Sequence, residues 1–275
     1  MTQDALARLV GAGRVVVLSG AGLSTSSGIP DYRGPTGLAR GATPMTFQAF
    51  TADPLARQRY WARSHLGWQL IAQAKPSAGH RAVTALQQRE LIAGVITQNV
   101  DGLHQAAGTA GVIELHGSLD QVVCLQCAQR TGREQLAARL RAANPDWTGA
   151  ANGLKPDGDV DLDDALVGSF ISVDCLRCAG QLKPDVVFFG EAVPRPRVAQ
   201  CFALVEQACA LLVLGSSLKV MSGYRFVLRA SALGIPVAIV NQGPTRGDDH
   251  AEVRLDGPLD EVLTTLVGQL GSGLT

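Results

Sequence analysis

Four of the six cysteines stand in two pairs whose spacing suits a metal ion. Cys124 and Cys127 form one Cys-x-x-Cys pair, and Cys175 and Cys178 form the other. Together they can place four thiolates about 2.3 Å from one tetrahedral Zn²⁺, which closes the shell and makes the site structural. The 47 residues between the pairs exceed the usual ribbon spacing, so a folded insertion must bring the pairs together. A redox role is a less favoured alternative, because it would have to account for both motifs, and buried free thiols are less favoured still.

Four short apolar runs each end in small polar residues. These ends lie at 19–22, 97–102, 215–217 and 241–243. In a doubly wound α/β sheet the carboxyl ends of the strands converge on one crevice, where hydroxyl and amide groups suit ribose and phosphate. Any one of these ends could be an ordinary turn, since turns are rich in Gly, Ser and Asn. Four of them together favour a nucleotide-binding crevice.

The first of these ends has only part of a dinucleotide fingerprint. Gly20 and Gly22 let a ligand approach the main chain closely, and free N–H groups at such a turn can bind an anion. Thr25 stands where a third glycine belongs, and no acidic residue closes a following strand about 20 residues on. The loop instead continues as polar residues up to position 33, stiffened by Pro30. An ordinary strand-to-helix turn therefore stays open as an explanation of the Gly-x-Gly.

Of the five histidines, His116 is the best placed for proton transfer. It follows an apolar run and precedes Gly117 and Ser118. There, an imidazole with a pKa near neutrality could act as a general base that faces the crevice. His104 is a comparable candidate by composition, and a lone histidine is more often structural, so residue type alone leaves both roles open.

A parallel sheet would bring these residues together. Six apolar runs predict strands, at 15–18, 94–97, 112–115, 185–189, 211–214 and 237–240. Helical patterns alternate with them, which predicts a mostly parallel, doubly wound, Rossmann-like α/β sheet. We expect this part to comprise residues 1–34, 90–120 and 183–275. Two insertions, a helical one at 35–89 and a zinc module at 121–182, would form a smaller domain.

The composition indicates a globular intracellular protein. Of its 275 residues 46% are hydrophobic and 17% charged, which excludes a disordered chain. Basic and acidic residues both number 24 and no basic run occurs, which argues against nucleic acid as the main ligand. The N-terminus lacks the apolar core of a signal peptide, and no stretch reaches about 18 uninterrupted apolar residues. We therefore expect a cytoplasmic monomer with no membrane partner.

Taken together, the motifs resemble the sirtuin family, the NAD-dependent protein-lysine deacylases. The segments that carry the resemblance, besides the cysteine pairs, are GAGLSTSSGIPDYRG (20–34), TQNVDGLH (97–104), ELHGS (114–118), LKPDVVFFGE (182–191), LGSSLKV (214–220) and VNQG (240–243). They span nearly the whole chain in the family's order. RQRYWAR (57–63), PDGDV (156–160) and SGYRF (222–226) look like the class II branch. The lack of a transit-like leader suggests a bacterial, cytoplasmic relative.

The resemblance implies that NAD⁺ binds extended across the crevice. Ala21 and its flanking glycines would hold the pyrophosphate, Ile29 and Asp31 the nicotinamide carboxamide, and Leu259 the adenine. The residues that the motifs place around NAD⁺ are Gly20, Ala21, Gly22, Ser24, Ile29, Asp31, Tyr32, Arg33, Gln98, Asn99, Val100, Asp101, Gly215, Ser216, Ser217, Asn241, Gln242, Gly243 and Leu259.

The resemblance also implies a mechanism. The acyl-lysine oxygen would attack C1′ of the nicotinamide ribose, which Asn99 contacts, and expel nicotinamide. His116 would then act as general base on the ribose hydroxyls, so that the 2′-oxygen attacks the alkylamidate. The products would be nicotinamide, free lysine and 2′-O-acyl-ADP-ribose. The substrate strand would lie between 219–222 and a second segment, formed by Val187, Phe188, Phe189, Gly190 and Glu191.

Tyr60 and Arg63 are the candidates for residues that determine which acyl group is removed. They are three residues apart in a helical pattern, so they would share one helix face. In relatives that remove acidic acyl groups, a Tyr and an Arg at this spacing bind the distal carboxylate. We therefore expect acetyl or longer and acidic acyl groups as substrates; a core Tyr60 and a surface Arg63 are the alternative. A protein mono-ADP-ribosyltransferase and a non-catalytic NAD sensor also stay open as functions.

Overall fold

Six parallel strands form the main sheet of the computed structural model, which describes residues 2–32, 44–149 and 152–271. In sheet order they are β11 (Val253–Asp256), β10 (Val237–Asn241), β9 (Ala210–Leu214), β1 (Val15–Ser19), β2 (Ile92–Thr97) and β3 (Val112–Glu114). From β1 the chain runs outward to β3 and then returns to β9 on the other side of β1. The order therefore reverses between β1 and β9, where an α/β sheet of this kind binds its ligand.

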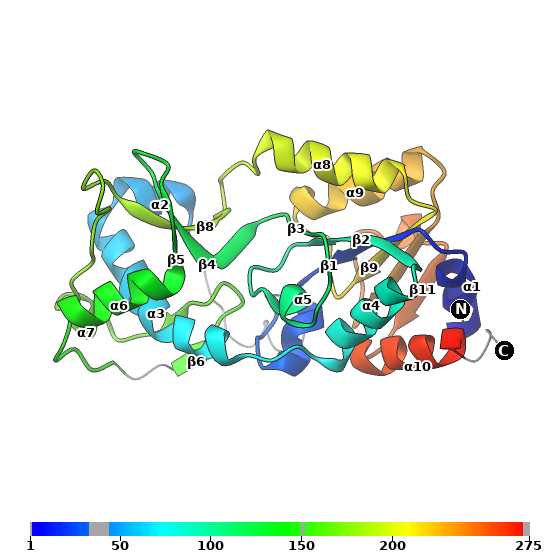
Figure 1. Ribbon diagram of the computed structural model, residues 1–275, viewed down its shortest axis with the longest axis horizontal. Helices are drawn as coiled ribbons and strands as arrows, with labels where there is room; N and C mark the ends of the chain where they lie inside the picture. Colours follow the sequence, from blue (N-terminus) through cyan, green and yellow to red (C-terminus); the bar gives the residue numbers. More distant parts are fainter. Residues whose placement is uncertain (1, 33–43, 150–151, 272–275) are drawn as a thin grey trace.

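Helices cover both faces of this sheet, as the buried β1 run requires. Val15 and Val17 pack into a core with α1 (Gln3–Gly11), α4 (Ala78–Gln88) and α10 (Leu259–Gly271). Val16 and Leu18 face the opposite core, with α8 (Arg195–Glu206) and α9 (Met221–Ala232). Figure 1 shows α8 and α9 above the sheet and α4 and α10 below it. The predicted doubly wound α/β fold is confirmed.

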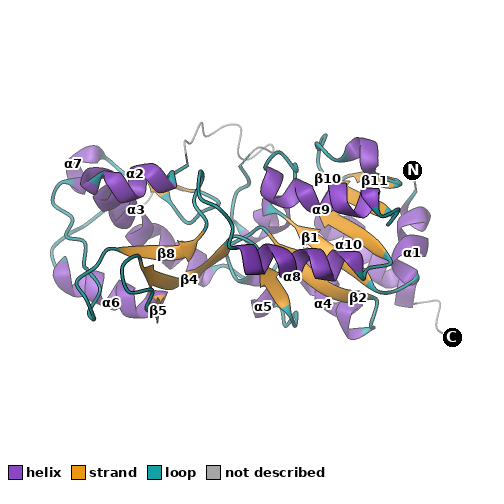
Figure 2. Cartoon of the chain, turned by 90° about the horizontal axis from the view of Figure 1, so that it is seen from above, coloured by secondary structure: helices purple, strands orange, loops and turns teal. Residues whose placement is uncertain are grey.

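A second body, which we call the small part, comprises residues 44–74, 117–149 and 152–186. Its sheet joins β5 (Arg130–Gly132), β4 (Gly117–Cys124) and β8 (Leu182–Val186) in antiparallel fashion. Its other elements are α2 (Phe47–Ala52), α3 (Pro54–Gln73), α6 (Arg133–Ala143), α7 (Asp164–Val167) and the hairpin of β6 (Asn152–Leu154) and β7 (Val160–Asp161). These surround a core of their own, at the end of the molecule away from both termini (Figure 2).

The structure corrects two of the predicted domain boundaries. Residues 78–88 were expected in the small part, but α4 packs on the main sheet through Ala82, Val83 and Leu86. The predicted strand at 185–189 belongs to β8, which pairs with β4 of the small part and ends at Val186. An amphipathic pattern identifies a helix or strand but does not say which of two cores it will cover. None of the helices in the described ranges is long and apolar enough to cross a membrane.

Candidate active site

A cavity of about 1170 Å³ lies at the carboxyl ends of the main strands. It is larger than a typical small-ligand pocket of roughly 300–1,000 Å³, so a dinucleotide and a substrate side chain can share it. All residues predicted above to hold NAD⁺ or the substrate strand line this cavity, apart from Arg33, which lies outside the described residues. Tyr60 and Arg63 are not among the described residues that line it.

Glycines shape the cavity where β1 and β9 end. The Gly22 N–H donates to the Gly215 carbonyl oxygen at 2.9 Å, so the two turns meet backbone to backbone. A Cβ on Gly20 would lie 2.8 Å from the Gly215 oxygen, and Gly215 itself has a φ of +61°. Side chains are therefore excluded from the point where the sheet order reverses. The main chain stays accessible there, which fits the close approach of a pyrophosphate.

Polar side chains tie the ends of β1 and β2 together on the floor of the cavity. Asn99 Nδ2 donates to the Gly20 carbonyl and to Ser24 Oγ, both at 3.0 Å. Ser24 Oγ in turn donates to Asp101 Oδ2 at 2.7 Å, and Asp101 Oδ1 accepts the Leu103 N–H at 3.0 Å. Burial raises the pKa of Asp101, which these two hydrogen bonds partly oppose. The network holds the Asn99 amide in one orientation at the cavity wall.

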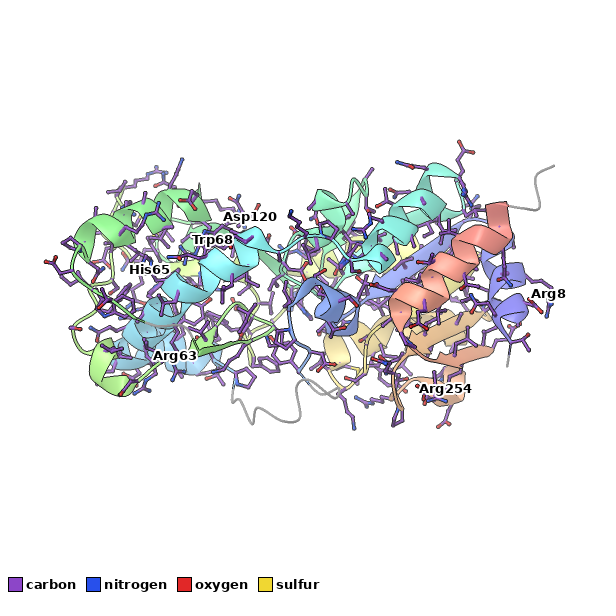
Figure 3. All side chains as sticks on the ribbon, turned by 90° about the horizontal axis from the view of Figure 1, so that it is seen from below. Arg8, Arg63, His65, Trp68, Asp120 and Arg254 are labelled. Atoms are coloured by element: carbon purple, nitrogen blue, oxygen red, sulfur yellow. The ribbon has the colours of Figure 1, made fainter. Side chains whose placement is uncertain are left out.

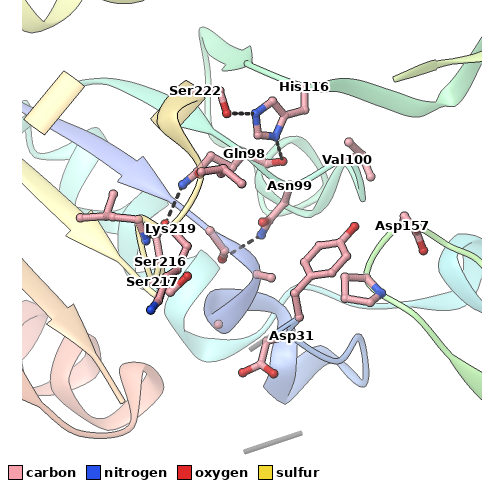
Figure 4. Close-up of a pocket in the computed structure, with 18 of the residues that line it drawn as sticks. Asp31, Gln98, Asn99, Val100, His116, Asp157, Ser216, Ser217, Lys219 and Ser222 are labelled. Atoms are coloured by element: carbon pink, nitrogen blue, oxygen red, sulfur yellow. Dashed lines mark hydrogen bonds between the residues drawn. The ribbon is translucent and has the colours of Figure 1, made fainter. Parts of the chain in front are cut away.

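His116 lies at the edge of the cavity, where Figure 4 shows its ring between Ser222 and Gln98. Its Nδ1 lies 2.9 Å from the Gln98 carbonyl oxygen. Because a carbonyl can only accept, Nδ1 carries the proton and the neutral ring keeps its lone pair on Nε2. Burial lowers the pKa of His116, against the Gln98 hydrogen bond, and Arg197 and Arg225 lower it further. At neutral pH this imidazole is therefore an uncharged base.

The local fold fixes where His116 points. Gly117, the first residue of β4, has a φ of +82°, and a Cβ there would fall 1.9 Å from the Asp185 carbonyl oxygen. The Val187 N–H also donates to the His116 carbonyl at 2.7 Å. By contrast, His104 is buried, with Nε2 bonded to Ser19 Oγ, and burial lowers its pKa to about 3. The geometry therefore favours His116 over His104 as the base.

The segment 187–191 runs along the cavity beside His116. Glu191 accepts the Phe188 N–H at 2.9 Å and lies 3.1 Å from Lys183 Nζ. The Phe189 carbonyl accepts from the Phe47 N–H, so α2 supports this segment from behind. A substrate strand that lies along this segment would therefore contact a main chain that these hydrogen bonds hold in place.

Tyr60 and Arg63 lie on α3, behind the cavity wall; Figure 3 shows Arg63 on this helix. The Tyr60 ring is 2% exposed and packs against Phe50, Trp61 and Phe188, with ring centroids 5.2–5.4 Å apart. Its hydroxyl has no hydrogen-bond partner among the described residues. Arg63 Nη1 lies 3.7 Å from Asp159 Oδ2. Phe188 thus separates Tyr60 from the cavity, and an acidic side chain already pairs with Arg63.

The hairpin of β6 and β7 brings an acidic residue into the cavity that the sequence did not single out. Pro156 and Asp157, between the two strands, line it. Figure 4 shows Asp157 beyond Val100, on the side away from Ser216 and Ser217. The PDGDV segment was noticed only as a mark of the class II branch. Its place in the site depends on how the insertion folds back.

The four cysteines converge as predicted. Their Sγ atoms all lie within 4.8 Å of one another, with Cys124–Cys178 at 3.5 Å and Cys127–Cys175 at 3.8 Å. Tetrahedral zinc–thiolate bonds of about 2.3 Å require sulfur separations of about 3.8 Å. Both pairs also end in matching turns, where Ala128 and Ala179 adopt positive φ. The donor set and spacing fit one structural zinc ion.

Comparison with known proteins agrees with this geometry. The sequence profile of the Sir2 family matches residues 20–222. The chain is 60% identical over 260 residues to NAD-dependent protein deacetylase 1 of Streptomyces coelicolor, which covers 94% of this chain and 87% of that protein. The corresponding protein of Mycobacterium avium is 53% identical over 260 residues, covering 94% and 92%. A solved complex of Sir2 with a p53 peptide and NAD⁺ superposes with a TM-score of 0.80 at 30% identity, covering 99% of this chain and all of that one. The chain belongs to the Sir2 family.

Proposed function

We propose that the protein is an NAD⁺-dependent deacylase that frees the side chains of acylated protein lysines. The observation that carries this proposal is His116, which lines a cavity large enough for a dinucleotide and an acyl-lysine and whose Nε2 is the unprotonated ring nitrogen. A general base at this point suits proton removal from a ribose hydroxyl. The relatives from Streptomyces coelicolor and Mycobacterium avium, both named NAD-dependent protein deacetylases, support the same chemistry.

The residues at the strand ends suit NAD⁺. The glycine turns after β1 and β9 would hold the pyrophosphate, and Ser216 would contact phosphate at their junction. Asn99 would orient the nicotinamide ribose, since its amide is fixed by Gly20 and Ser24. Bound NAD⁺ supplies an electrophilic anomeric carbon with nicotinamide as its leaving group. His116 would accept a proton from a ribose hydroxyl.

Transfer of ADP-ribose to a protein nucleophile is the competing function. It would use the same cleavage of NAD⁺ but would not require a base poised for a ribose hydroxyl. The tautomer of His116 therefore favours deacylation. A non-catalytic NAD sensor would have no need of either His116 or the Asn99 network.

The products distinguish these functions directly. Purified protein is incubated with NAD⁺ and an acetyl-lysine peptide, and all products are weighed by mass spectrometry. We expect equal amounts of nicotinamide, deacetylated peptide and O-acetyl-ADP-ribose. A mass gain of ADP-ribose on protein without deacetylation would overturn the proposal, and NAD⁺ that is bound but not consumed would indicate a sensor. A His116→Ala variant, checked for zinc content and folding by circular dichroism, serves as the inactive control.

The acyl preference is a separate proposal. We propose that Tyr60 and Arg63 act on the distal end of longer or acidic acyl groups, which would reach past Val100 toward the hairpin. The unpartnered hydroxyl of Tyr60 and the unpartnered Nε of Arg63 support this role, because both are buried donors without acceptors among the described residues. The Arg63–Asp159 contact opposes it, and so does Phe188, which stands between Tyr60 and the cavity. Kinetics on acetyl, succinyl and glutaryl peptides, with Arg63→Ala, would decide.

A further inference from the structure

We propose that Ser222 relays a proton from a ribose hydroxyl to His116; this inference rests on the proposed deacylase function. Ser222 Oγ lies 2.8 Å from His116 Nε2, and both residues line the cavity. Figure 4 shows the two side chains pointing at one another. Ser222 lies near the beginning of α9, in a segment that the sequence placed along the substrate strand and that carries part of the resemblance to the class II branch.

The direction of this hydrogen bond follows from the other side of the ring. Nδ1 donates to the Gln98 carbonyl, so Nε2 of the neutral imidazole can only accept. The Ser222 hydroxyl must therefore be the donor. Its proton already occupies the lone pair that a general base would offer to the ribose. A ribose hydroxyl has to displace Ser222 from Nε2 or pass its proton through Ser222.

The surrounding backbone favours the second route. A Cβ on Gly223 would lie 2.4 Å from Gln98 Oε1, so the start of α9 packs directly on the Gln98 side chain. The Gln98 carbonyl holds Nδ1 of His116 at the same time. One residue thus fixes both partners of the 2.8 Å contact relative to each other. Ser222 is half-buried at the cavity wall, where its oxygen can also accept from a ligand hydroxyl.

The relay balances without a further reactant. The ribose O–H bond breaks and its proton goes to Ser222 Oγ, while the proton that Ser222 already carries goes to His116 Nε2. The ribose oxygen uses the released electron pair to form its bond to the acyl carbon. Ser222 ends neutral, and His116 ends as an imidazolium whose Nδ1–H still faces the Gln98 carbonyl.

The experiment compares Ser222→Ala, Ser222→Thr and Ser231→Ala in the full-length zinc-loaded enzyme. Ser231 lies on the same helix but is exposed and contacts His250, which makes Ser231→Ala the matched control. Nicotinamide release and its exchange precede the step that uses His116, whereas peptide deacetylation requires that step. We expect Ser222→Ala to lower deacetylation about 10- to 100-fold while nicotinamide exchange is retained. Ser222→Thr, which keeps a hydroxyl, should recover most of the loss.

A solvent isotope measurement adds a readout that a structural role would not move. If two protons move in the transition state, the deacetylation rate is a curved function of the D₂O fraction. If only one proton moves, the function is linear. We expect a curve for the parent enzyme and a line for Ser222→Ala. Unchanged or faster deacetylation in Ser222→Ala would show that Ser222 merely competes for Nε2 and would overturn the relay. Equal loss of exchange and deacetylation would also overturn it, in favour of a structural role. Absence of any nicotinamide release by the parent enzyme would instead contradict the proposed function itself.

Discussion

Gln98 connects the parts of the site that perform different tasks. Its carbonyl accepts from His116 Nδ1, and its side-chain amide donates to Ser216 Oγ at 2.8 Å. The same side chain touches Gly223 at the start of α9. A single residue after β2 therefore sets the tautomer of the base and joins it to the turn after β9. Neither role is visible in the residue type, since glutamine side chains are mostly exposed.

At the scale of the residue, the pKa of His116 gives a prediction. Only the neutral ring accepts a proton, and burial holds its pKa below the usual 6.5, so activity should persist to mildly acidic pH and fall below that. Arg225 contributes to this lowering, so Arg225→Gln should move the acidic limb of the kcat/KM profile to higher pH. Arg229→Gln is the control, because Arg229 pairs with Glu206 on the protein surface. A limb that moves to lower pH in Arg225→Gln would contradict the assignment of His116 as base.

At the scale of elements, a glycine lets α3 pack against the turn of the hairpin. A Cβ on Gly67 would lie 2.0 Å from the Gly158 carbonyl oxygen. Replacing a helical Gly by Ala normally stabilises by about 1 kcal/mol, but here the clash should make Gly67→Ala destabilising by about 1–3 kcal/mol. Urea unfolding measures the free energy of unfolding. Gly268→Ala in α10 provides the comparison, because open space surrounds that Cβ, and it should be neutral or stabilising.

Asp159 of the same hairpin should limit activity on acidic acyl groups. Asp159 lies 3.7 Å from both Arg63 and Lys155, and burial raises the pKa of Asp159 to about 6, so it is ionised at pH 7.5. Asp159→Asn removes the carboxylate that Arg63 faces. The ratio of kcat/KM for glutaryl against acetyl peptides should then rise about fivefold, near the ~1 kcal/mol of a partly exposed ion pair.

Arg63 itself provides the control for this prediction. In the double variant Asp159→Asn, Arg63→Ala, the gain on glutaryl peptides should disappear, whereas acetyl peptides should be turned over as by Asp159→Asn alone. A gain that survives the loss of Arg63 would assign it to some other change in the cavity. An unchanged ratio in Asp159→Asn would remove Arg63 from the proposed acyl site.

For the molecule as a whole, the sequence predicts what short-range patterns encode. Buried apolar runs that end in small polar residues predicted most of the main strands and the crevice, because both properties are local. The strand Val253–Asp256 was missed, since its mixture of apolar and charged residues lacks the run of a central strand. Helical spacing put Tyr60 and Arg63 on one face of α3. Whether that face meets the cavity or Phe188 depends on how the helix sits in the second core, which spacing does not encode.

The zinc cluster should couple that second core to catalysis. Cys124 ends β4, and β4 pairs with β8, which leads directly into the segment at 187–191 that lines the cavity. Loss of the metal should therefore loosen the small part and the substrate side of the site, while the glycine turns of the main sheet still hold ADP-ribose. We expect Cys124→Ser to lose zinc and deacetylation and to raise hydrogen exchange in residues 117–186.

Affinity for ADP-ribose, measured by calorimetry, should change less than about threefold in the same variant. The residues that would hold it lie where β1, β2, β9 and β10 end and where α10 begins, outside the small part. Cys209→Ser is the matched control, because Cys209 is an exposed thiol outside the cluster and its loss should alter none of these quantities. If the variant loses zinc but keeps its deacetylation activity, the metal does not support the substrate side of the active site. Equal loss of ADP-ribose binding would mean that the two cores unfold together, because the metal then supports the whole molecule rather than the small part.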